Sequence, residues 1–75
     1  MSEKEFLKYI REELELEDIS LSLHSVFREL PNWSSLNALL IVSRINDEHN
    51  VLISTAELAE CKTLEDIFNR VRKKL

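Results

Sequence analysis

The sequence contains no glycine, one proline and one cysteine among its 75 residues. Without glycine it cannot form a phosphate-cradling P-loop, a dinucleotide-binding fingerprint, a nucleophile elbow or an Asn-Gly hairpin turn. A single proline leaves little to interrupt helices, so the composition favours an all-α fold before any pattern is considered. The one cysteine, Cys61, has no partner for an internal disulfide and cannot hold a zinc ion alone.

Long apolar runs are also missing. There is no stretch that could span a bilayer and no apolar core of a signal peptide, so we expect a cytoplasmic protein without a membrane partner. Hydrophobic residues make up 44% and charged residues 32% of the chain. This balance is typical of globular rather than disordered proteins. A chain of this length supports one small hydrophobic core, so residues 1–75 are expected to form a single domain.

Basic residues are scarce outside the C-terminal end. Ten Lys and Arg residues stand against fourteen Asp and Glu residues, for a net charge of −4. Four of the basic residues lie in the last six positions, so residues 1–69 carry six basic against fourteen acidic residues, or −8. Residues with this net negative charge repel the phosphate backbone of a nucleic acid. We therefore expect no nucleic-acid partner and do not favour a helix-turn-helix DNA-binding function. Basic partner proteins suit this charge better, because complementary charge speeds association.

The first half of the chain combines one amphipathic helix with a long loop. Ser2 and Glu5 form an S-x-x-E capping box, and the apolar spacing that follows predicts a helix over residues 3–16. Residues 17–34 have no clean period, and a loop of this length is unusual in so small a domain. We expect its apolar residues to pack over the core, with one helical turn around residues 24–29.

The second half of the chain carries three further helix starts. The second helix should begin after Ser34, a good N-cap residue, and extend to about Glu48. Its apolar positions are too many for one core stripe, so part of this helix should stay apolar at the surface or face a partner. A capping box that begins at Ser54 predicts a short third helix ending near Cys61, and a cap at Thr63 predicts an amphipathic last helix.

Few residues could support catalysis or bind a metal. His24 and His49 lie far apart without metal-ligand spacing, so no metal site is expected. His49 follows the apolar row of the second helix and is expected to be a partly buried structural histidine. Cys61 is expected to be a small core residue, since a reactive thiol would need basic neighbours at an exposed site. Nothing positions a catalytic triad, so the protein is expected to have no intrinsic catalysis.

The segment Trp33-Ser34-Ser35-Leu36 lies at the junction of the long loop and the second helix. With Ser34 as the N-cap, Ser35 is the first residue inside the helix, and its hydroxyl should be exposed near unpaired backbone N–H groups. A phosphodiester on Ser35 would lie where anions are favoured. On local physics alone, a serine at a helix start more often serves the structure than carries a modification.

The segment ELPNWSSL, residues 29–36, resembles the signature of the acyl carrier protein family. In that family a tryptophan-aspartate-serine-leucine segment opens the second helix, and the serine carries 4′-phosphopantetheine. The likeness covers essentially the whole chain, because Asp47-Glu48, Ile53 and the segment 63–67 follow in the family's order. The resemblance implies an all-α, acyl-carrier-like four-helix bundle with a long first loop and a short third helix.

The resemblance also implies a function for Ser35. A phosphopantetheinyl transferase would attach 4′-phosphopantetheine from coenzyme A to this serine, giving a phosphoprotein. The thiol of the arm would hold acyl groups as thioesters for acyl-transferring and chain-elongating enzymes of fatty-acid or polyketide-like biosynthesis, a role in lipid metabolism. We expect a monomer that docks to these partners through an apolar centre with a charged rim. The centre is Leu36, Leu39, Leu40 and Ser43, and the rim is Asp47, Glu48 and Glu57.

The sequence departs from the family pattern around this site. Ser34 stands where an aspartate is usual, and a serine replaces the capping hydrogen bond but not the negative charge. Leu40 replaces a common glutamate, Asn37 and Asn46 occupy frequently acidic positions, and Arg44 lies on the same helix. These changes indicate a dedicated set of partners, or else a degenerate, unmodified carrier fold that acts only in protein–protein interaction. A peptidyl or D-alanyl carrier is less favoured, because peptidyl carriers usually show a Gly-Gly-x-Ser motif.

Overall fold

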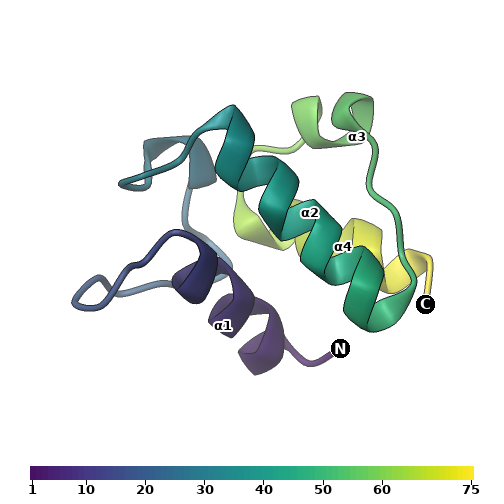
Figure 1. The fold of residues 1–75 in the computed structure, drawn as a ribbon, viewed down its shortest axis with the longest axis horizontal. Coiled ribbons are helices and arrows are strands. Elements are labelled where there is room, and N and C mark those ends of the chain that lie inside the picture. The colour runs from purple at the N-terminus through teal and green to yellow at the C-terminus, as the bar shows by residue number, and fades with distance from the viewer.

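The computed structural model describes residues 1–75 and contains four α-helices and no β-sheet (Figure 1). The helices are α1 (Glu3–Glu13), α2 (Ser35–His49), α3 (Thr55–Ala59) and α4 (Leu64–Lys73), with a short 3-10 turn, η1 (Phe27–Glu29), before α2. The predicted all-α bundle with a long first loop and a short third helix is therefore confirmed. None of the helices is long and apolar enough to cross a membrane.

Each α-helix begins at a hydroxyl side chain that accepts a backbone N–H, which explains why the helix starts could be predicted. The capping boxes at the starts of α3 and α4 are complete. At α1 the Ser2 hydroxyl accepts the Glu5 N–H at 3.1 Å. The capping box predicted here is only half formed, because the Glu5 carboxylate does not accept the Ser2 N–H and instead lies 3.6 Å from His49 Nε2 on α2.

Helix α1 ends at Glu13, three residues before the predicted end at Leu16. Glu15 takes the left-handed conformation with φ 55°. The Leu16 N–H then donates to the Arg11 carbonyl at 2.9 Å and the Glu15 N–H to the Glu12 carbonyl at 3.3 Å, a Schellman motif. Glycine normally occupies the left-handed position, and this chain has none. The reversal turns the Leu16 side chain into the core.

The long first loop packs over the core, as predicted, and is joined to the start of α4. The Leu64 N–H donates to the Ser25 carbonyl at 3.0 Å, and the Glu65 N–H donates to the Leu23 carbonyl at 2.8 Å. These bonds pair the end of the loop with backbone groups that the first turn of α4 leaves free. Phe27 is thereby held in the core, where its side chain is fully buried.

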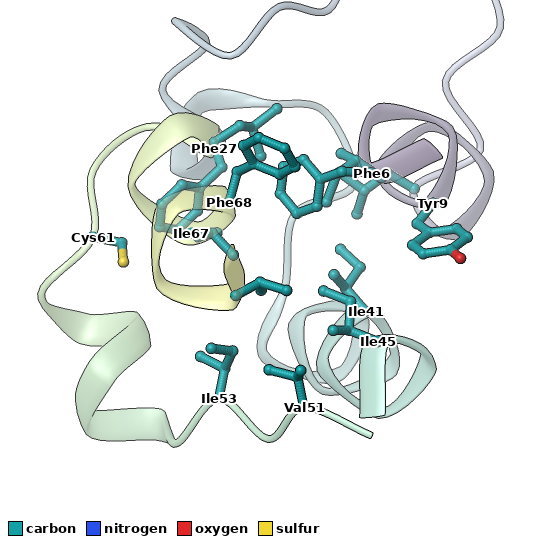
Figure 2. Packing of buried hydrophobic residues seen from close by; sticks show 14 of the residues in the cluster. Phe6, Tyr9, Phe27, Ile41, Ile45, Val51, Ile53, Cys61, Ile67 and Phe68 are labelled. Carbon is teal, nitrogen blue, oxygen red and sulfur yellow. The ribbon is translucent and has the colours of Figure 1, made fainter. Parts of the chain in front are cut away.

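The core lies where α1, α2 and α4 meet, and residues from the loops close it (Figure 2). The rings of Phe6 on α1 and Phe68 on α4 are tilted against each other with centroids 5.3 Å apart. Ile41 and Ile45 extend into the same cluster from α2, and Val51 and Ile53 enter from the link that follows (Figure 2). Burial of such side chains stabilises the fold by about 1.5–3 kcal/mol each.

Cys61 and His49 have the structural roles that the sequence predicts. Cys61 is buried, and burial raises the pKa of its thiol, so the thiol stays protonated and unreactive at neutral pH. His49 is mostly buried, and its Nε2 atom lies 3.0 Å from the Tyr9 hydroxyl of α1. This contact joins the end of α2 to α1. Separately, the structure has no group of three or more His, Cys, Asp or Glu residues that could hold a metal ion.

Candidate functional site

The two serines at the start of α2 have different environments. Ser34 lies outside the helix in an extended conformation, and its Oγ atom accepts the Asn37 N–H at 3.1 Å. Ser35 is the first helical residue, and its side chain is exposed. The Ser34 hydroxyl is therefore engaged as the helix cap, whereas the Ser35 hydroxyl is available for modification.

Two asparagines hold the start of α2 in place. Asn32 has φ 66°, a left-handed conformation that asparagine tolerates, and its side-chain amide donates to the Leu14 carbonyl at 2.8 Å. The Asn37 side-chain amide donates to the Asn32 carbonyl at 2.8 Å. Beside them the Trp33 ring is tilted against Phe27, with centroids 4.7 Å apart. The loop that presents Ser35 is thus fixed both to the end of α1 and to the core.

A groove of about 490 Å³ opens beside Ser35, between η1, α2 and α3. Both Ser34 and Ser35 line it, and eight of its thirteen lining residues are hydrophobic. Its apolar walls include Leu39 on α2, Leu58 on α3 and Ile53 on the link between the two helices. We call this cavity the α2–α3 groove. Its size and its mostly apolar lining suit an apolar chain that reaches it from Ser35.

The outer face of α2 presents three leucines to solvent. The exposed fractions are 66% for Leu36, 55% for Leu39 and 44% for Leu40. They and the exposed Ser43 follow helical spacing, opposite the buried residues of the helix. No charged residue occurs from residue 30 to residue 43. We call Leu36, Leu39, Leu40 and Ser43 the leucine face. It forms an uncharged, largely apolar surface next to Ser35.

The acidic residues expected to form the charged rim differ in their surroundings. Asp47 and Glu48 are exposed in the last part of α2, about 18 Å along the helix from its first residue. Glu57 on α3 is only partly exposed, and its carboxylate accepts from Lys74 Nζ at 2.7 Å and from the Ser54 N–H at 3.1 Å. The bond to Lys74, with the capping bond, lowers the pKa of Glu57 to about 2. Its charge is therefore largely matched within the protein.

Arg44 does not add positive charge to the leucine face. Its guanidinium pairs with Glu12 at 2.8 Å and with Glu13 at 3.4 Å, both on α1. The same group lies 4.4 Å from the centroid of the Tyr9 ring. Arg44 thus joins α2 to α1, and its charge is paired with the carboxylates of α1.

The sequence of the chain matches the family model described as a phosphopantetheine attachment site over residues 4–71. The match spans most of the chain, so the chain belongs to the phosphopantetheine-binding carrier family, and the resemblance seen in the sequence is confirmed. Members of this family carry covalently attached 4′-phosphopantetheine and act as carriers that interact with phosphopantetheinyl transferases and biosynthetic enzymes. No curated protein and no solved structure gives a significant match to the chain.

The residues around Ser35 fit this prosthetic group. An exposed hydroxyl is present for the ester bond, and the positive end of α2 and its free N–H groups favour a phosphate there. The α2–α3 groove begins at the same residue and offers apolar walls. The site therefore has room and suitable chemistry for both the phosphate and the arm.

Arg28 is one residue of this site that sequence reasoning missed. Its guanidinium donates to the Cys61 carbonyl at 2.6 Å and to the Leu58 carbonyl at 3.1 Å, and it lies 4.6 Å from the centroid of the Phe27 ring. The side chain lines the α2–α3 groove. No local pattern marks it, because its partners are thirty or more residues away and meet it only when α3 packs against η1.

Proposed function

We propose that this protein is an acyl carrier in which Ser35 is the attachment residue for 4′-phosphopantetheine. One observation carries the proposal: Ser34 and Ser35 are both exposed at the start of α2 and line the α2–α3 groove, but Ser34 is engaged as the cap, which leaves the Ser35 hydroxyl free. The arm would supply a thiol that holds acyl intermediates as thioesters. The acyl groups would serve partner enzymes of fatty-acid or polyketide-like biosynthesis.

The chain's own residues would position and protect what Ser35 carries. Ser34 fixes the first turn of α2, so the Ser35 side chain leaves the helix at a constant angle. The dipole of this 15-residue helix stabilises a negative phosphate at its start. The walls of the α2–α3 groove, including Leu39 and Leu58, would shelter an apolar chain from water.

Partner enzymes would dock on the leucine face. Leu36, Leu39 and Leu40 are exposed beside Ser35, where a partner must approach to reach the arm. Apolar contacts at the centre of an interface mainly set how long a complex lasts, and rim charges mainly set how fast it forms. We therefore assign residence time to the leucines, and association rate to Asp47 and Glu48. Glu57 remains part of the proposed rim with a charge already paired to Lys74.

The test is the intact mass of the protein after incubation with coenzyme A and a broad-specificity phosphopantetheinyl transferase. We expect one added phosphopantetheine on the wild type and none on Ser35→Ala. Ser20→Ala is the matched control, because Ser20 is an exposed serine of the long loop that lies outside the site. Modification of Ser35→Ala would contradict the assignment.

A second candidate function is an unmodified carrier fold that acts only by binding other proteins. It is favoured by Ser34, which leaves no negative charge next to Ser35, and by the uncharged leucine face. The two functions differ in one outcome. A folded protein that no transferase modifies, but that still binds a partner through the leucine face, would support the interaction module and exclude the carrier.

A further inference from the structure

Arg28 is the one charged residue among the thirteen that line the α2–α3 groove. The other twelve are apolar or hydroxyl-bearing side chains, so no carboxylate in the lining matches its charge. Arg28 also forms no ion pair with any Asp or Glu of the protein within 4.0 Å. Arg28 is exposed to solvent, so its charge is hydrated in the unloaded protein and is accessible to an anion that enters the groove.

The Arg28 guanidinium is held in a fixed position and keeps unused hydrogen-bond donors. Its two bonds to the carbonyls of Leu58 and Cys61 use two of the five N–H groups of a guanidinium. Its contact with the Phe27 ring restrains the plane of the group. Three donors and the full positive charge therefore remain, and a planar guanidinium held in this way suits a carboxylate or a phosphate.

We propose that Arg28 makes the α2–α3 groove a binding site for an anionic group on the molecule that Ser35 carries. The anion is the phosphodiester of the arm or a carboxylate on the acyl cargo, because both would reach the groove from Ser35. The inference rests on the proposed function, since Ser35 must first be loaded. It adds one anion-binding group to a groove whose walls are otherwise apolar or hydroxyl-bearing.

The experiment compares four forms of the protein: unmodified, carrying the arm alone, and carrying acyl chains of equal length that end in a methyl group or in a carboxylate. Loading at Ser35 is first verified by intact mass. The Nε–H signal of Arg28 is then followed by NMR, together with the thermal midpoint of unfolding. Arg72 is the internal control, because its guanidinium also lies over a phenylalanine ring, Phe68 at 5.6 Å, without an ion pair and outside the groove.

A cargo carboxylate at Arg28 predicts a shift of its Nε–H signal only with the carboxylate-ended chain. That chain should also raise the thermal midpoint by about 4 °C over the methyl-ended chain, the upper scale of one solvent-exposed ion pair in a domain of this size. A phosphodiester at Arg28 predicts that the arm alone moves the signal. Any gain in the thermal midpoint on loading should be lost in Arg28→Gln and kept in Arg72→Gln.

Two results would overturn the inference, and they are distinguishable. If loading succeeds but the Arg28 signal moves no more than that of Arg72 in any form, the groove binds no anion through Arg28, while the proposed function stands. If Ser35 accepts no arm at all, the proposed function fails and the inference falls with it. The NMR comparison uses the wild-type protein, so it does not depend on whether Arg28→Gln folds.

Discussion

The cap at Ser34 makes a quantitative prediction about the start of α2. The Ser34 hydroxyl is the acceptor for the Asn37 N–H at 3.1 Å, so Ser34→Ala leaves that amide without its partner. Loss of such a cap costs about 1 kcal/mol of the free energy of unfolding. For a domain of 60–100 residues this lowers the thermal midpoint by about 4–8 °C. Ser20→Ala, in the exposed part of the long loop, should unfold at the wild-type temperature.

Ser34→Asp tests the charge separately from the hydrogen bond. Aspartate keeps the acceptor and adds a negative charge at the positive end of α2, which should stabilise the fold by about 0.3–1 kcal/mol at low salt. Its folded-state pKa should lie below its unfolded value, so the gain should be present above that unfolded value and disappear as the pH falls through the folded pKa. Circular dichroism melts across pH measure this directly.

Two results would contradict the proposed role of the Ser34 cap. One is a Ser34→Ala protein that melts with the wild type, which would mean that the 3.1 Å bond contributes nothing. The other is a Ser34→Asp protein that is less stable than wild type at neutral pH, which would mean that α2 does not favour a negative charge at its start. The second result would also weaken the case for a phosphate on Ser35.

Four further predictions concern the leucine face, the core, the left-handed turn and an ion pair. Leu40→Glu should weaken partner binding about tenfold while the exposed Leu52→Glu control does not, as measured by titration; equal affinities would remove the leucine face from docking. Ile41→Ala, at a buried position, should cost about 2–5 kcal/mol in urea unfolding, and a smaller loss would mean a loosely packed core. Glu15→Gly should raise the free energy of unfolding by up to about 1 kcal/mol by relieving the φ of 55°, and a lower stability would contradict the assigned strain. Because the pKa of Glu57 falls from 4.5 to about 2, its stabilising effect should be complete above pH 4.5 and be lost toward pH 2; a Glu57→Gln protein with the same acid-unfolding curve as wild type would contradict this.

The helix starts could be predicted because their signals are local. Ser34, Ser54 and Thr63 each accept an N–H only three residues further along the chain, so sequence spacing alone identifies the bond. The proposed attachment segment is local too, but the helix start alone favours a structural serine, and only the resemblance of residues 29–36 to the family signature indicates a modification. The family match covers residues 4–71 and confirms the family, whereas the choice of Ser35 stays a proposal.

The end of α1 and the details of the site could not be predicted, because they depend on distant contacts. Glu15 has no sequence mark of a left-handed residue, and it adopts that conformation because the turn places Leu16 in the core. Arg28 gains its position from carbonyls thirty or more residues away. The pairing of Glu57 with Lys74 likewise spans seventeen residues and changes the available charge of an acid that the sequence placed in the docking rim.

Ser35, rather than its neighbour Ser34, is the serine that we propose to carry the arm. The most direct measurement is peptide mapping by tandem mass spectrometry of the wild-type protein after reaction with coenzyme A and a phosphopantetheinyl transferase. We expect a single phosphopantetheine located on Ser35. An arm located on Ser34, or a folded protein with no arm on either serine, would contradict it.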